Sequence, residues 1–207
     1  MKRPSDEFLK KHFEDLIEGA DSVLDIGGGL RIDRGRSNRV DSRQQWARNL
    51  LKARGMAYRV LDYVDTYNPD IVGDIQELPL PDESEKAIVC LSVLEHVENP
   101  FKAASELYRV LAPGAKCLIY VPFLFYYHAE KGYYGDYWRF TEDSLRLLFR
   151  PFTELHIQPT RGPIETLIRL SPLGRYIVFC NAGFLLDRLF KKQHSRQTSG
   201  YNLFLIK

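Results

Sequence analysis

Cysteine, net charge and long apolar runs are all scarce in this chain, and each scarcity excludes a class of protein. Its 207 residues include three cysteines, Cys90, Cys117 and Cys180, which lie far apart within apolar runs. This spacing favours reduced core residues in a cytoplasmic protein over a disulfide framework or a metal site, so we expect no bound metal. A net charge of +2, from 29 basic and 27 acidic residues, gives no bulk attraction to nucleic acid.

The hydrophobic segments are shorter than those of membrane-spanning or secreted proteins. No stretch of about 18 uncharged apolar residues occurs, so no segment is expected to span a bilayer. The first residues are charged and lack the apolar core of a signal peptide. The length suffices for one α/β domain with a full core and not for two, so we expect residues 1–207 to form a single domain.

Strand-like and helix-like segments alternate from one end of the chain to the other. Short apolar runs of strand character occur at 23–26, 58–62, 70–73, 87–91, 116–121, 152–157 and 201–206. Helical periodicity occurs between them, with Ser5 as the expected N-cap of the first helix and Thr141 as that of a later one. The alternation predicts an α/β fold with a doubly wound, mostly parallel sheet covered by helices on both faces.

The most informative stretch is 23–29, in which Val-Leu-Asp-Ile runs directly into three glycines. Glycine can take positive φ and lets a ligand lie against the main chain. Asp25 is near the carboxyl end of this predicted strand, the end at which open α/β sheets bind ligands. An ordinary strand-to-loop turn is the alternative interpretation of the same pattern.

Acidic residues end three successive predicted strands, at Asp25, Asp62 and Asp74. An acid after the second strand can accept hydrogen bonds from ribose hydroxyls, which suits a nicotinamide dinucleotide or S-adenosylmethionine. A dinucleotide site requires a third glycine where Ile32 stands, and Asp25 would repel a pyrophosphate. The pattern therefore favours S-adenosylmethionine.

At this point the chain resembles the class I S-adenosylmethionine-dependent methyltransferases, in particular the methyltransferase type 11 group. The matching motifs are the stretch 23–29, Gly-Asp-Ile at 73–75 with Leu-Pro at 78–79, Leu-Glu-His-Val at 94–97 and Tyr-Arg-Val-Leu-Ala-Pro-Gly at 108–114. They span roughly residues 20–122. The resemblance implies a Rossmann-like sheet of seven strands with the last strand antiparallel, S-adenosylmethionine as cofactor and methyl transfer as the activity.

Carried over by position, the resemblance implies eight cofactor-binding residues: Asp25, Gly27, Gly29, Asp62, Tyr63, Asp74, Ile75 and Ser92. The glycine backbone would lie against the methionine part of the cofactor, with Asp25 and Ser92 nearby. Asp62 would hold the ribose, a role that Asp65 could take instead, and Tyr63 would pack on the adenine. Asp74 and Ile75 would meet the adenine edge.

Two departures from the family pattern lie directly after the glycines. Arg31 occupies the position where another glycine is usual, and 37 positions separate Asp25 from Asp62, which indicates an insertion. This insertion contains four arginines within 30–39, which could bind an anionic group or form a solvated surface loop. Loss of catalysis is one consequence of such changes, so the alternative function is a non-catalytic S-adenosylmethionine-binding or scaffold protein on the same fold.

The segment 123–140 is dense in aromatic residues and is the expected substrate loop. His128 is the candidate catalytic base, with His96 as a second candidate more readily explained by packing. The candidate substrate residues are Tyr126, Tyr127, Tyr133, Tyr134, Asp136 and Arg139. Tyrosine rings with hydroxyl edges suit sugars or aromatic compounds. A salt bridge between Asp136 and Arg139 would explain that pair without a role in binding.

An apolar helical insertion is expected at about 163–190, before the last strand. It could lie in a membrane interface near a lipid-linked substrate, cover the sheet, or form a homodimer surface. The sequence thus predicts an enzyme that methylates a small-molecule or glycan/lipid-precursor acceptor by in-line displacement. Nucleic acid is not expected as a partner.

Overall fold

The computed structural model describes residues 3–33, 35 and 40–207, so Arg34, Arg36 and Arg39 of the predicted arginine loop lie outside the described residues. The first half of the chain comprises α1 (Pro4–Ile17), β1 (Ser22–Ile26), η2 (Ser42–Gln44), α2 (Gln45–Ala53), β2 (Ala57–Asp62), η3 (Asp65–Tyr67), β3 (Ile71–Val72), β4 (Glu85–Leu91) and η4 (Leu94–His96). The second half comprises α3 (Pro100–Val110), β5 (Leu111–Pro122), α4 (Glu142–Leu148), β6 (Glu154–Pro159), α5 (Pro163–Leu170), η5 (Pro172–Arg175), α6 (Ile177–Leu189) and β7 (Gly200–Ile206).

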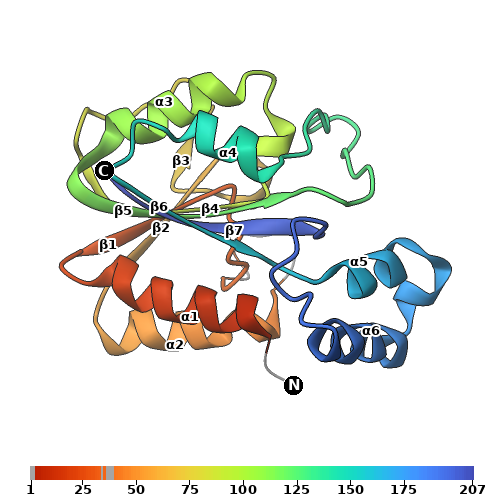
Figure 1. The fold of residues 1–207 in the computed structure, drawn as a ribbon. Helices are drawn as coiled ribbons and strands as arrows, with labels where there is room; N and C mark the ends of the chain where they lie inside the picture. The colour runs from red at the N-terminus through yellow and green to blue at the C-terminus, as the bar shows by residue number, and fades with distance from the viewer. Residues whose placement is uncertain (1–2, 34, 36–39) are drawn as a thin grey trace.

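The strands form one seven-stranded sheet in the order β3-β2-β1-β4-β5-β7-β6. The pairs among β1 to β5 are parallel, and β7 is antiparallel to both of its neighbours, β5 and β6. Helices α1 and α2 cover one face and α3 and α4 the other, as Figure 1 shows. The predicted fold class, including the antiparallel last strand, is confirmed.

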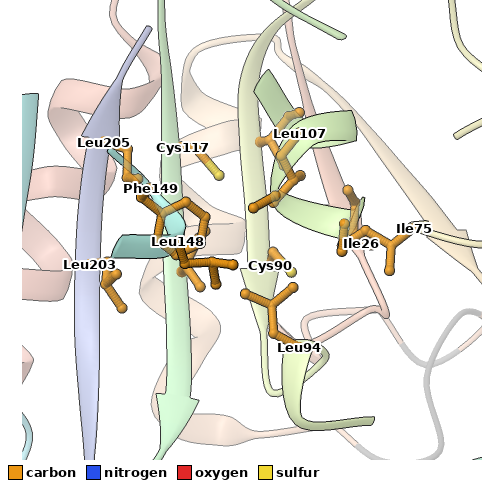
Figure 2. Packing of buried hydrophobic residues seen from close by; sticks show 14 of the residues in the cluster. Ile26, Ile75, Cys90, Leu94, Leu107, Cys117, Leu148, Phe149, Leu203 and Leu205 are labelled. Atoms are coloured by element: carbon orange, nitrogen blue, oxygen red, sulfur yellow. The ribbon is translucent and has the colours of Figure 1, made fainter. Parts of the chain in front are cut away.

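The sheet separates two apolar clusters because alternate side chains of a strand point to opposite faces. In β4, Ile88 and Cys90 belong to the cluster under α3 and α4, whereas Ala87 and Val89 belong to the cluster under α1 and α2. Figure 2 shows Cys90 packed within the first cluster. Burial on both faces explains why the central strands are continuously apolar in sequence. All three cysteines are buried and free, as expected.

The starts of α3 and α4 follow local capping signals, whereas the start of α1 differs from the prediction. The Thr141 side chain accepts from the Ser144 amide and caps α4, as predicted, and Asn99 caps α3 in the same way. The prediction that Ser5 caps the first helix is wrong: α1 starts at Pro4, and Ser5 is buried inside its first turn. Proline has its φ preset for a helix and lacks the amide that would need a cap. The helix therefore begins at Pro4, before the predicted cap.

The predicted helical insertion is a hairpin in which α6 packs on α5 beyond the side of the sheet (Figure 1). The Asp187 carboxylate on α6 is fully buried and accepts from the amides of Ile164 (3.0 Å) and Glu165 (2.9 Å), so it caps the start of α5. Glu165 is also buried and pairs with Arg3 and Arg169. Among the described residues, no helix has the length and apolar character needed to cross a bilayer.

Asp187→Ala leaves two amides at the start of α5 without their acceptor. We expect the free energy of unfolding to fall by about 1–2 kcal/mol, the range for loss of an N-cap. Urea unfolding measures this loss, and Glu14→Ala, which removes an exposed acid from α1, is the matched control. Equal midpoints for the two variants would contradict the capping role of Asp187.

Candidate functional site

A cavity of about 430 Å³ opens at the carboxyl ends of β1, β2, β3 and β4. Its volume falls in the range of roughly 300–1,000 Å³ that is usual for small-molecule sites. The glycine loop 27–29 forms one part of its wall, and residues 130–137 of the aromatic loop form another. The cavity therefore joins the predicted cofactor site to part of the predicted substrate loop.

Seven of the eight predicted cofactor residues line this cavity: Gly27, Gly29, Asp62, Tyr63, Asp74, Ile75 and Ser92. They come from four different strand ends and meet because the parallel strands all end at the same edge of the sheet. Which part of a ligand each one contacts stays a prediction.

Asp25 is the exception, because it is fully buried and does not line the cavity. Its carboxylate accepts from the amides of Gly29 (3.1 Å) and Leu30 (2.9 Å) and from the hydroxyl of Tyr58 (2.6 Å). Burial raises the pKa of Asp25 to about 7, although the three donors act in the opposite direction. Asp25 thus fixes the glycine loop from beneath, and its expected role near the methionine part of the cofactor stays a prediction.

The loop conformation explains why glycine is needed at two positions. Gly27 has φ +77° and donates its amide to the Leu61 carbonyl. A Cβ at Gly29 would stand 2.5 Å from the Leu91 carbonyl oxygen, so a side chain there would push the loop away from β4. Arg31 also has positive φ, +53°, and lines the cavity. Arg31 therefore keeps the positive φ expected of the glycine that is usual at this position. Its side chain adds a cation to the cavity wall.

The two acids at the next strand ends differ in how far their carboxylates are already engaged. Asp62 accepts from the Val64 amide at 3.3 Å, and burial raises its pKa. The Asp74 carboxylate accepts from the Gln76 amide (2.8 Å) and from its Nε2 (3.1 Å). Asp74 therefore shapes the turn that presents Ile75 and Gln76 to the cavity, whereas Asp62 retains more accepting capacity for a ligand.

The two candidate bases lie together, but only His96 lines the cavity. The rings of His96 and His128 are 4.8 Å apart, and each ring faces the buried carboxylate of Glu95. His128 also lies against the Asp136 carboxylate, and the neighbouring Glu95 raises the pKa of His128. His128 thus stands behind His96 as seen from the cavity, and its role as catalytic base stays a prediction.

The predicted substrate residues divide into two groups. Tyr133 and Tyr134 line the main cavity. The remaining four, Tyr126, Tyr127, Asp136 and Arg139, do not. The hydroxyl of Tyr126 donates to the Arg169 carbonyl, and Tyr127 is 78% exposed. Asp136 and Arg139 form a two-bond ion pair (2.6 and 2.7 Å) that lowers the pKa of Asp136 to about 2. This ion pair links two positions of the aromatic loop to each other. It is the salt bridge that the sequence analysis gave as the alternative to a role in substrate binding.

Several cavity residues had no distinguishing sequence signal. Tyr67 on η3, Gln76, Glu98, Glu130 and Tyr137 all line the cavity. They lie in loops whose paths depend on tertiary contacts, such as the bonds from the Tyr137 and Trp138 amides to the Glu95 carbonyl. Among these residues, only Tyr137 had a sequence signal, because it is one of the aromatic residues of the segment 123–140.

Ionisation of Asp25 gives a testable pH dependence. Its pKa of about 7 in the folded chain lies above the value of 3.8 for an unperturbed aspartate. Its contribution to stability is therefore present below pH 3.8 and is lost as the pH rises through about 7. Relative to Asp25→Asn, which does not titrate, the wild-type protein should lose of order 4 kcal/mol of unfolding free energy over this window.

Chemical denaturation at a series of pH values measures that difference. Asp21→Asn, at an exposed site just before β1, is the matched control and should follow the wild-type profile. Parallel pH profiles for the wild type and Asp25→Asn would contradict the raised pKa of Asp25.

Comparison with known sequences identifies a methyltransferase pattern in part of the chain. Residues 41–119 match the family model described as a methyltransferase domain. A probable S-adenosylmethionine-dependent methyltransferase from Mycolicibacterium smegmatis is 42% identical over 50 residues, a match that covers 24% of this chain and 20% of that protein. The match thus spans about a fifth of the relative.

Comparison with solved structures extends the likeness to nearly the whole chain. A SAM-dependent methyltransferase from Archaeoglobus fulgidus superposes with a TM-score of 0.60 at 16% identity, covering 98% of this chain and 94% of that one. A SAM-dependent methyltransferase from Methanosarcina mazei gives a TM-score of 0.54 at 12% identity, covering 94% and 95%. Residues 41–119 therefore match the methyltransferase domain family, and the fold of nearly the whole chain is similar to that of these two S-adenosylmethionine-dependent methyltransferases.

Proposed function

We propose that this protein is an enzyme that transfers a methyl group from S-adenosylmethionine to a small-molecule or glycan/lipid-precursor acceptor. The observation that carries the proposal is the convergence of the glycine loop, Asp62, Ile75 and Ser92 on one cavity that also includes Tyr133 and Tyr134. A cavity shared between the two sets of residues can hold a cofactor and an acceptor in contact.

The residues of the cavity suit the parts of S-adenosylmethionine. Gly29 packs against Leu91 so closely that a Cβ would displace the loop, and this packing holds the main chain of 27–29 at the cavity wall, where the methionine part would lie. Asp62 provides a partly buried acceptor for ribose hydroxyls. Ile75, which is 4% exposed, and the 65% exposed ring of Tyr63 provide apolar surface for the adenine. The Asp74 turn would place Gln76 at the adenine edge.

Catalysis in this proposal consists mainly of orientation. When bound, S-adenosylmethionine supplies an electrophilic methyl group that a nucleophile of the acceptor displaces in line. The chain would position the acceptor and exclude water, which can contribute roughly 7–11 kcal/mol. Tyr133, Tyr134 and Tyr137 offer aromatic faces with hydroxyl edges for an acceptor of sugar or aromatic type. Of the two candidate histidines, only His96 lines the cavity, so in this proposal His96 would contact the acceptor and the predicted base His128 would not.

The alternative function, a non-catalytic S-adenosylmethionine-binding or scaffold protein, rests on Arg31 and the insertion beside the glycine loop. Arg31 keeps the left-handed backbone of a glycine position, so the loop is not distorted by it. The cavity also continues to Tyr133 and Tyr134 and is not restricted to the cofactor residues. Both observations favour the enzyme.

The cofactor site is tested by isothermal titration with S-adenosylmethionine and S-adenosylhomocysteine. Asp62→Ala should weaken binding of both by about 1–3 kcal/mol, the range for hydrogen bonds to a charged group. Asp65→Ala is the matched control, because Asp65 is an exposed acid of η3 that does not line the cavity. Failure of the wild-type protein to bind either ligand would overturn the proposal, and equal weakening by both substitutions would remove Asp62 from the site.

We also propose that the hairpin of α5, η5 and α6 binds the surface of an anionic membrane. Large apolar side chains are exposed along it, including Leu167 (65%), Ile177 (65%), Val178 (64%) and Leu189 (72%). Exposed cations accompany them at Arg175, Arg188, Lys191 and Lys192. Apolar side chains beside cations suit the boundary between acyl chains and anionic headgroups. Such binding would bring the cavity close to a lipid-linked acceptor.

Vesicle sedimentation tests the membrane surface. The protein should sediment with vesicles that contain phosphatidylserine and much less with phosphatidylcholine alone, and high salt should release it. A double variant, Ile177→Glu with Leu189→Glu, should lose binding, whereas Leu147→Glu at an exposed leucine of α4 should not. A concentration-dependent dimer that the double variant dissociates, without vesicle binding, would contradict the membrane proposal and assign the hairpin to a homodimer.

A further inference from the structure

Two histidines and a buried glutamate converge at the wall of the cavity, and no part of the proposed cofactor site uses them together. Glu95 and His96 belong to η4, which follows β4, and His128 lies in the loop after β5. One ligand atom from each of the three lies within 4.8 Å of the other two. From this geometry we infer that Glu95, His96 and His128 bind a divalent transition-metal ion of the zinc class.

The first argument is the state of the glutamate. Its side chain is fully buried, and neither carboxylate oxygen has a hydrogen-bond partner within the described part of the chain. A buried carboxylate requires a compensating cation or donor. Arg139, a nearby cation, already forms two short bonds to Asp136 (2.6 and 2.7 Å). This leaves the two imidazoles, or an ion between them and Glu95, to compensate the buried carboxylate.

The second argument is the orientation of the imidazoles. His96 Nδ1 is 2.6 Å from the Gly135 carbonyl oxygen, and His128 Nδ1 is 3.0 Å from that of Tyr126. A carbonyl only accepts, so each Nδ1 directs its proton at a carbonyl, and each Nε2 is directed at Oε1 of Glu95. A neutral imidazole in this orientation offers its Nε2 to a cation that lies between the ring and Glu95. Metal-binding histidines are held in this way by an acceptor at the other nitrogen.

The third argument is distance. Glu95 Oε1 is 3.5 Å from His128 Nε2 and 3.8 Å from His96 Nε2. Zinc bonds of about 2.0–2.2 Å in tetrahedral geometry separate ligand atoms by about 3.3 Å. The three ligand atoms all lie within 4.8 Å of one another, so side-chain rotations that shorten the longest of these separations would bring them onto one ion. Two imidazoles and one carboxylate form a ligand set that suits zinc and other transition metals and leaves further positions open.

The open positions indicate what the ion would do. His96 lines the cavity, together with Tyr134 and Gly135, so the unfilled side of the ion faces the space assigned to the acceptor. We therefore infer that the ion holds an oxygen of the acceptor, such as a hydroxyl or carboxylate. This second step rests on the proposed function, whereas binding of the ion does not.

Direct metal titration tests the site. Protein stripped with EDTA is titrated with Zn²⁺ by calorimetry and with Co²⁺ by visible absorption, which reports the ligand geometry. We expect one equivalent to bind with micromolar or tighter affinity. Glu95→Gln and His128→Ala should each weaken binding at least tenfold. His156→Ala, which removes an exposed histidine paired with Glu154, is the matched control and should bind as the wild type does.

The outcomes separate this inference from the proposed function. Two results would overturn the metal site: no stoichiometric binding, or binding that neither Glu95→Gln nor His128→Ala weakens. In either case a proton shared between Glu95 and His128 would occupy the position inferred for the ion. Titration of the same samples with S-adenosylhomocysteine reports the cofactor site independently. Metal bound without the cofactor product would uphold the ion and reject the methyltransferase, and the reverse result would reject the ion alone.

Discussion

The buried carboxylate of Asp25 is the contact on which the cavity depends. It connects three parts of the fold, because it accepts from two amides of the glycine loop and from the hydroxyl of Tyr58 on β2. Burial with these donors fixes the path of the main chain directly after β1. A loop fixed in this way can present its backbone to a ligand without the entropy cost of ordering it on binding. The remaining strand ends then complete the cavity around it.

The fold was predictable because its signals are local and repeated. The central strands are apolar on both faces, Thr141 caps α4, and glycines follow β1, so each element is marked by its own residues. The error at Ser5 arose because two start signals, a proline and a serine, are adjacent, and the proline determines where the helix begins. This error affects only the first turn of α1.

The site was predictable only where it follows strand ends. Asp62, Asp74 and Ser92 were expected at the carboxyl edge of the sheet and line the cavity there. The bonds from Asp25 to the loop amides could not be predicted, because sequence places an acid near a turn but does not say on which side of the main chain its carboxylate lies. The pairing of Glu95 with His128 joins residues from two loops, and no spacing rule connects them.

The proposed sites lie in a definite order across the fold. They are the cavity, the cluster of Glu95, His96 and His128, and the exposed hairpin. The proposed cofactor residues lie at the ends of β1 and β2 and in the turn after β3, and the proposed acceptor residues lie in the loop after β5. His96, which belongs to the proposed ion site, stands at the wall between them. The hairpin adds a surface outside the sheet, for which we propose membrane binding.

A crystal structure of the protein with S-adenosylhomocysteine tests the central claim most directly. The account predicts the ligand in the cavity, with its ribose hydroxyls on the Asp62 carboxylate and its amino acid part against the backbone of Gly27 and Gly29. A ligand bound elsewhere, or one that reaches across to Tyr133 and Tyr134 and leaves no space for an acceptor, would contradict it.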